Sequence, residues 1–227
     1  MARETFKRIP LEKQELILDV ATREFGENGY HKANVNTIAD KAGISIGAMY
    51  KYFSSKEELF CETLEMGIRI LNTMFSSISH APGDPFEKVR AVFENVLAFA
   101  REKPYPLQIY MMLLSSNMDE FAKRYAHTIE EVGHTFFKQI IKDGIRDGYI
   151  DEDLDIDTAT FFLDNHLMMF TFSQISLYLK IRQETFLEGR ISPERVIDET
   201  VRVCKRIFGA YPVDKKQQTR NYRERRL

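Results

Sequence analysis

The sequence of 227 residues contains no tryptophan and only two cysteines, Cys61 and Cys204. These cysteines fall in different predicted helices, and neither has a partner at metal-ligand spacing. We therefore expect no disulfide and no metal site at either thiol. Both are predicted to be small buried side chains in a reducing compartment.

The sequence also lacks the pattern of a secretory leader and of a membrane span. Arg3 and Glu4 stand near the start with no apolar run behind them, so we expect no signal peptide. The most apolar stretch, residues 161–181, is interrupted by polar groups such as Asp164 and Lys180. It is too polar for an uninterrupted bilayer span and is predicted to be a buried helix. We accordingly expect a cytoplasmic protein that does not enter a membrane.

Neither sign of charge dominates the chain, whose formal net charge is −2 at pH 7. This balance lacks the overall basic character usual for nucleic-acid-binding domains. Residues 1–56 carry nine Lys or Arg against seven Asp or Glu, residues 57–212 carry seventeen against twenty-five, and residues 213–227 carry six against two. The acidity therefore lies in the middle part, and the two ends are the parts suited to approach phosphate.

Residues 34–56 predict two short helices joined by a tight turn, because apolar residues recur at helical spacing on both sides of it. Gly43 can take the left-handed conformation that ends the first helix. Asn34 can cap the start of that helix, and Ser45 can cap the start of the second. A further helix is predicted before them, over residues 10–29. The pattern is that of a helix-turn-helix.

A longer motif surrounds this turn and ends in Tyr-x-Tyr-Phe-x-Ser-Lys. Over about residues 10 to 65 the sequence resembles the TetR family of transcriptional regulators. The resemblance implies an all-α protein with a three-helix DNA-binding domain (1–56), a helical effector-binding and dimerisation domain (57–212), and here a basic tail (213–227). It also implies a repressor that a small hydrophobic or aromatic effector releases from a palindromic DNA operator. We expect no enzymatic activity and no cofactor. The matching positions are Val35, Ile38-Ala39, Ala42-Gly43, Ser45, Gly47, Tyr50, Tyr52-Phe53 and Ser55-Lys56.

The second helix of the pair is the expected recognition helix. Met49 and Phe53 are four residues apart and should pack inward, which leaves the opposite face toward the DNA groove. The resemblance implies that Tyr50, Tyr52 and Lys56 contact phosphate. It also implies that the positions of Ile46, Gly47 and Ala48 approach base edges. The family often has Lys or Arg at Ile46 and Thr or Ser at Ala48, so the apolar residues here favour contact with thymine methyl groups. The DNA-binding candidates are Thr37, Ser45, Ile46, Gly47, Ala48, Tyr50, Lys51, Tyr52 and Lys56.

The rest of the chain predicts further helices and no strands. We expect residues 1–9 to form a mobile charged arm. The helices are predicted at residues 56–80, 86–102, 107–115, 119–147, 158–187 and 193–208, with breaks at the prolines and at Gly148.

The last two predicted helices are candidates for a homodimer interface. The final helix carries a wide apolar surface, of which one half can cover the core and the other can pack on a second copy, as the resemblance implies. A monomer with a large core is the alternative. The two stripes consist of Val196, Thr200, Val203 and Ile207, and of Ile197, Val201, Cys204 and Phe208.

The middle of the chain is rich in methionine and aromatic residues, which can form either plain core or a cavity for a hydrophobic effector. We predict such a cavity. Its candidate residues are Phe93, Tyr105, Tyr110, Met111, Phe136, Phe137, Gln139, Phe162, His166, Met169 and Phe170, and Asp164 and Asn165 are further candidate polar anchors.

An enzyme and a helical adaptor are the two other functions considered. Glu131 and His134 match one half of the Glu-x-x-His pattern of di-iron bundles, with His127 and Glu130 nearby. A second half is missing, so we expect no metal. An adaptor leaves the tyrosines and lysine of the motif unexplained.

Overall fold

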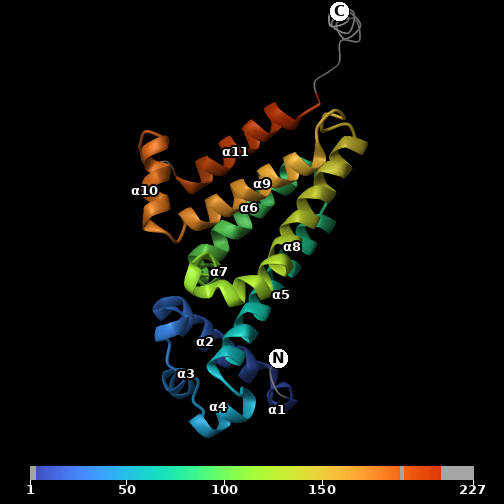
Figure 1. The fold of residues 1–227 in the computed structure, drawn as a ribbon. Coiled ribbons are helices and arrows are strands. Elements are labelled where there is room, and N and C mark those ends of the chain that lie inside the picture. Colours follow the sequence, from blue (N-terminus) through green and yellow to red (C-terminus); the bar gives the residue numbers. More distant parts are fainter. Residues whose placement is uncertain (1–3, 190–191, 211–227) are drawn as a thin grey trace, which may run out of the picture.

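The computed structural model describes residues 4–189 and 192–210 (Figure 1). Arg3 and the basic tail 213–227 lie outside the described residues. The described part forms no strand beyond one isolated bridge between Ile150 and Gly209, so the all-α prediction is confirmed. The helices are α1 (Glu4–Lys7), α2 (Leu11–Lys32), α3 (Val35–Lys41), α4 (Ile46–Tyr52), α5 (Lys56–His80), α6 (Pro85–Glu102), α7 (Pro104–Met112), the 3-10 turn η1 (Ser116–Met118), α8 (Asp119–Arg146), α9 (Ile156–Ser173), α10 (Leu177–Phe186) and α11 (Pro193–Phe208).

Helices α1 to α4 lie together at one end of the molecule, and we call them the head (Figure 1). Their apolar faces meet around Ile17 and Phe25 of α2, Ile38 of α3 and Met49 of α4, each at most 1% exposed. Burying a side chain of this size contributes about 1.5–3 kcal/mol. These contacts therefore stabilise α3 and α4, which have seven residues each and are too short to be stable alone.

Helices α6 to α11 form the larger part, which we call the body (Figure 1). Its core contains Phe93 of α6, Phe137 of α8, Phe170 of α9 and Cys204 of α11, all buried. These residues come from helices that lie far apart in the sequence, so only the packed body brings them together.

Helix α5 belongs to both parts. Its first turns, with Leu59 and Phe60, pack in the head core, and its later turns, with Phe75 and Ile78, pack in the body core. The head core also continues into α7 and the start of α8. The two parts therefore share packing, and their division at residues 56 and 57 remains a proposal.

The N-terminal segment differs from the mobile arm that we expected. Residues 4–7 form α1, whose Phe6 is only 2% exposed and packs with its ring 4.7 Å from that of Phe53. The hydroxyl of Thr5 donates a hydrogen bond of 2.7 Å to the carbonyl of Lys51. The prediction overlooked Phe6, an apolar residue among the charges, which anchors the segment to α4.

The predicted helix 158–187 is two helices, α9 and α10. Gln174 ends the first, and Ser176 takes an extended conformation and accepts a hydrogen bond from the Leu179 backbone N–H. A serine that caps a new helix explains the break. Within the described residues, no helix is long and apolar enough to cross a membrane.

Candidate nucleic-acid interface and effector cavity

The helix-turn-helix is formed by α3, α4 and the turn between them. Gly43 has φ +64°, and the Ile44 N–H donates to the Ala39 carbonyl across the turn. The Asn34 side chain accepts from the Asn36 N–H at 2.9 Å, and Ser45 Oγ accepts from the Ala48 N–H at 3.1 Å. The conformation predicted for the glycine and both predicted caps are thus confirmed.

Helix α4 presents one side to the head core and the other to solvent. Met49 and Phe53 are each 1% exposed, as predicted. On the opposite side, Ile46 is 40% exposed and Tyr50 is 49% exposed. The remaining candidates on or beside this face are Ser45, Gly47 and Lys51, which are exposed, and Thr37, Ala48 and Tyr52, which are half-buried.

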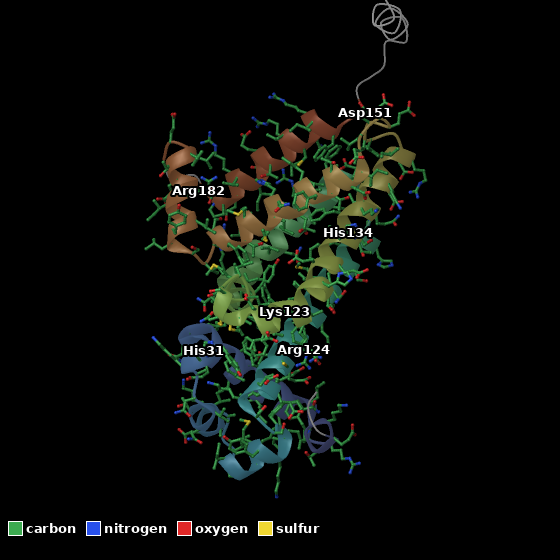
Figure 2. All side chains as sticks on the ribbon, viewed as in Figure 1. His31, Lys123, Arg124, His134, Asp151 and Arg182 are labelled. Atoms are coloured by element: carbon green, nitrogen blue, oxygen red, sulfur yellow. The ribbon has the colours of Figure 1, made fainter. Side chains whose placement is uncertain are left out.

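Lys56 stands where α5 begins and holds the head together. Its ammonium donates hydrogen bonds to the carbonyls of His31 at 3.0 Å and Ala33 at 3.3 Å, and it lies 5.0 Å from the centre of the Tyr30 ring. The end of α2 is thereby tied to the start of α5. Figure 2 shows His31 at the level where the head meets the body. The sequence did not predict this structural role, and a phosphate contact by Lys56 remains a prediction.

A second tie connects α2 to α3. Glu24 is only 5% exposed, and its carboxylate accepts from the Lys41 ammonium at 3.1 Å and from the Asn34 N–H at 3.4 Å. A buried carboxylate is costly unless it is paired, and here both oxygens have a partner. The position of the recognition helix pair therefore depends on this residue of α2.

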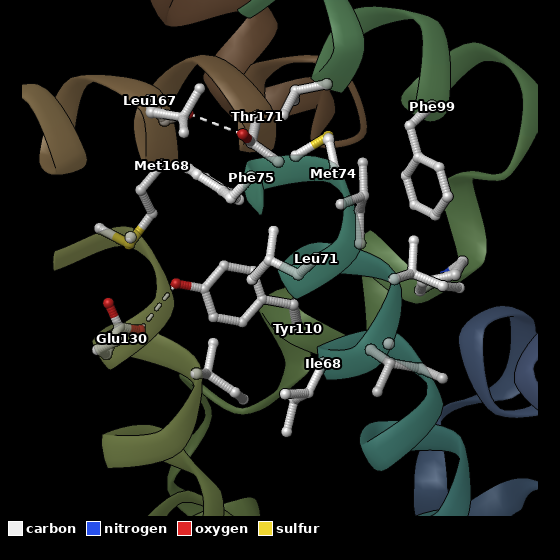
Figure 3. Close-up of a pocket in the computed structure, with 18 of the residues that line it drawn as sticks. Ile68, Leu71, Met74, Phe75, Phe99, Tyr110, Glu130, Leu167, Met168 and Thr171 are labelled. Atoms are coloured by element: carbon white, nitrogen blue, oxygen red, sulfur yellow. Dashed lines mark hydrogen bonds between the residues drawn. The ribbon is translucent and has the colours of Figure 1, made fainter. Parts of the chain in front are cut away.

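A cavity of about 150 Å³ lies between α5, α6, α7, α8 and α9 (Figure 3). Its wall is mainly aliphatic and aromatic, and three side chains form its polar end: Tyr110, Glu130 and Asp164. The apolar lining includes Leu64, Ile68, Leu71, Met74, Phe75, Phe99, Leu107, Ile109, Leu167 and Met168.

The polar end of the cavity is acidic. The Tyr110 hydroxyl donates a hydrogen bond of 2.8 Å to Glu130 Oε1 (Figure 3). Burial raises the pKa of the Asp164 carboxyl to about 6, with a further increase from the charge of Glu130 and an opposing effect from His134. Burial and the charge of Glu130 also raise the pKa of Tyr110.

Eleven residues were predicted from the sequence as candidates for the cavity wall. Within the described part of the chain, only Tyr110 of these eleven lines the cavity. Asp164, considered as a polar anchor, lines it as well. His166 instead bonds Thr200 Oγ1 at 2.9 Å, with its pKa lowered by burial. The others lie in the body core (Phe93, Phe136, Phe137 and Phe170), toward α2 (Tyr105), elsewhere on α7 (Met111), or on the exposed surface (Gln139, Phe162 and Met169).

Sequence reasoning missed the contribution of α5 to the cavity. Ile68 and Leu71 of this helix line the cavity, and neither is among the candidates predicted from the sequence. Gly67 was the available signal, because a glycine inside an apolar helical face leaves space. A Cβ placed there meets no atom within 4 Å.

Helix α7 connects the cavity to the head. Tyr110 and Leu107 line the cavity from one side of this helix. Tyr105, on the same helix, donates its hydroxyl to Glu27 Oε1 of α2 at 2.8 Å. A ligand that moves α7 would therefore act directly on the helix that supports the helix-turn-helix.

The histidines and glutamates considered for a metal site face different partners. Glu130 accepts from Tyr110, whereas Glu131 lies 3.7 Å from His127. Among the described residues, no group of three His, Cys, Asp or Glu side chains is arranged to hold a metal ion.

Comparison with known proteins agrees with this architecture. Residues 17–63 match the model of the bacterial regulatory proteins of the tetR family. The HTH-type transcriptional repressor KstR2 of Mycobacterium tuberculosis is 26% identical over 147 residues, which cover 65% of this chain and 74% of that protein.

Solved structures also share the fold. A TetR family transcriptional regulator from Chloroflexus aurantiacus has a TM-score of 0.62 and 26% identity, covering 93% of this chain and 100% of that chain. The transcriptional regulator FadR from Bacillus subtilis, in complex with stearoyl-CoA, has a TM-score of 0.64 and 21% identity, covering 83% and 95% of the two chains.

The head and the matching turn define a helix-turn-helix transcriptional regulator. The chain belongs to the TetR family. It is therefore a DNA-binding regulator rather than an enzyme, in agreement with the prediction from sequence.

Proposed function

We propose that the chain is a homodimeric repressor that leaves a palindromic DNA operator when a hydrophobic effector enters the cavity. The observation that carries the proposal is the exposed face of α4, whose other face is fixed in the head core. Ile46 and Ala48 offer no hydrogen-bond donor from their side chains, so we propose that they contact thymine methyl groups. The proposed phosphate contacts are Thr37, Ser45, Tyr50, Lys51, Tyr52 and Lys56.

Selection of bound DNA from a random pool tests the operator assignment. We expect a near-palindrome whose half-sites lie about one helical turn, or a multiple of it, apart. Ala48→Thr should change the preferred bases, because it adds a donor at the base edges. Lys51→Ala is the matched control and should weaken binding to all sequences alike. Uniform weakening by Ala48→Thr would contradict a base-reading role for α4.

A two-fold interface is proposed on α9 and α11, which lie side by side through the His166–Thr200 hydrogen bond. On α11 one stripe is buried, while Val203 is 44% exposed and Ile207 is 53% exposed. Phe161 of α9 is 72% exposed. Large apolar side chains that remain in water on two adjacent helices favour burial against a second copy.

Helix α10 carries further exposed apolar side chains. It has no buried residue within the described part of the chain, and Leu177, Tyr178 and Phe186 are each more than 70% exposed, at 73%, 76% and 71%. We propose that the same second copy covers it. Sedimentation tests the interface. Ile207→Asp should shift the dimer toward monomer, whereas the control Arg202→Asp, on another face of α11, should leave the dimer intact. A wild-type chain that sediments as a monomer would overturn this part of the proposal.

Effector control is proposed to act through α5 and α7. Both helices line the cavity, and both contact the head, α5 through Lys56 and α7 through Tyr105. FadR of Bacillus subtilis, in complex with stearoyl-CoA, supports a hydrophobic effector for this fold. Release of DNA requires that the effector bind the released state more tightly, by about 1–3 kcal/mol for a 5–150-fold change in affinity. Repeating the DNA selection with hydrophobic compounds present tests this step.

A further inference from the structure

The acidic end of the cavity restricts the chemistry of its ligand. The lining includes two carboxylates, and within the described residues it includes no lysine, arginine or histidine. Glu130 and Gly133 stand three residues apart on α8 and therefore share one face. The Asp164 carboxylate packs directly against that face, and a Cβ at position 133 would clash with its Oδ1. The two carboxylates are thus held at one end of an apolar space.

The hydroxyl donors of the wall are already used. Tyr110 donates to Glu130, Thr63 donates to the Phe60 carbonyl at 2.7 Å, and Thr171 donates to the Leu167 carbonyl at 2.7 Å. Ionised carboxylates only accept hydrogen bonds. The polar end of the cavity consequently offers acceptors and negative charge, and a ligand must supply the donors.

The apolar part fits the remainder of such a ligand. A space of about 150 Å³ whose wall is mainly aliphatic and aromatic can hold a group the size of a benzene ring. Met74 and Met168 are pliable and can adapt to the shape of this group.

We propose that the cavity binds an apolar molecule that carries a protonated amine, with the ammonium donating to Glu130 and Asp164. This inference rests on the proposed role of the cavity as the effector site and names the class of effector. An anionic head group would meet two like charges and no donor, so fatty-acid-like carboxylates are disfavoured. A neutral alcohol can donate one hydrogen bond but gains no charge pairing.

Three probes with one apolar body separate these cases: phenylbutylamine, phenylbutanol and phenylbutanoate. Calorimetric titration of the full chain at neutral pH should show the amine binding at least about tenfold more tightly than the alcohol, since a charge-assisted hydrogen bond is about twice as strong as a neutral one. The carboxylate should bind most weakly. Equal or tighter binding of the alcohol or the carboxylate would overturn the proposal, as would the failure of the amine to bind.

Variants of the same shape but without the charge test whether Glu130 and Asp164 are the carboxylates that bind the ammonium. Glu130→Gln and Asp164→Asn should each lower the affinity for the amine by about tenfold. The affinity for the alcohol should change by less than about threefold. Glu131→Gln is the matched control, because this neighbouring carboxylate faces His127 outside the cavity. If all three variants lowered the affinity for the amine equally, the overall negative charge of the helix surface would explain amine binding, and the proposed site would be contradicted.

DNA release is measured separately on the same proteins. Amine binding without release of DNA would support the class of ligand and contradict the proposed regulatory function. Release of DNA by the carboxylate alone would support the regulatory function and contradict the class of ligand.

Discussion

Tyr105 packs directly on the backbone of α2 at Gly26, where an added Cβ would lie 2.9 Å from the Tyr105 Cβ. Beside this contact, the Tyr105 hydroxyl and the Arg23 Nε both donate to Glu27 Oε1, at 2.8 and 3.0 Å. The absence of a side chain at Gly26 therefore determines how closely the body approaches the head.

Gly26→Ala should loosen this junction. Alanine improves helix propensity by about 1 kcal/mol, but overpacking costs about 1–3 kcal/mol. We therefore expect the free energy of unfolding to fall by up to about 2 kcal/mol. Gly67→Ala is the matched control in α5, because its Cβ meets nothing within 4 Å and the propensity gain should remain. Urea unfolding measures both variants. If the two substitutions stabilised the protein equally, the close contact between Tyr105 of α7 and Gly26 of α2 would be contradicted.

Lys56→Ala should affect both DNA binding and folding. Loss of one phosphate contact weakens binding to all DNA sequences and lowers the salt slope by about one unit. Loss of the bonds to the His31 and Ala33 carbonyls should also destabilise the head by about 1 kcal/mol. Lys51→Ala should lower the salt slope and leave stability within about 0.5 kcal/mol. If Lys56→Ala left the slope unchanged, the residue would have only its structural role.

Asp164→Asn should stabilise the protein at neutral pH. The pKa of Asp164 is about 6 in the fold against 3.8 for an unperturbed Asp. The folded state therefore binds this proton more tightly, and the contribution of Asp164 to stability falls as pH rises from about 4 to about 6. Asparagine avoids the cost of burying the charge.

The advantage of Asp164→Asn should consequently shrink as pH falls from about 6 to about 4. Glu130 and His134 of α8 and Tyr110 of α7 face this carboxyl and remain in both proteins, so the difference between them isolates Asp164. Thermal unfolding across this range measures it. A difference that stayed constant with pH would contradict the raised pKa.

Phe6→Ala should destabilise the head by about 3 kcal/mol, as is usual for a buried phenylalanine. The Phe6 ring also lies 5.8 Å from that of Tyr52, so DNA affinity should fall with it. Thr5→Val is the control, because it removes only the exposed hydrogen bond to Lys51 and should cost much less. Full stability of Phe6→Ala would mean that α1 contributes little to the head.

The helix-turn-helix could be predicted from the sequence because its determinants are local. Gly43, Ser45 and Asn34 act within a few residues of their own positions, and the motif around them is specific. The same holds for the breaks at Pro104 and Gly148, which the backbone itself sets. Helix α7 nevertheless begins at Pro104 and ends at Met112, whereas residues 107–115 were predicted, because a proline fits the first position of a helix.

The cavity could not be predicted in this way. Whether an aromatic residue fills the core or lines a space depends on which helices meet, so Phe93 and Phe137 became core while Tyr110 and Asp164 came together from α7 and α9. Lys56 likewise received its carbonyl partners only through the packing of α5 on α2. Local backbone chemistry thus made this chain a helix-turn-helix regulator, whereas contacts between distant segments decided where its ligand site lies and which charge that site carries.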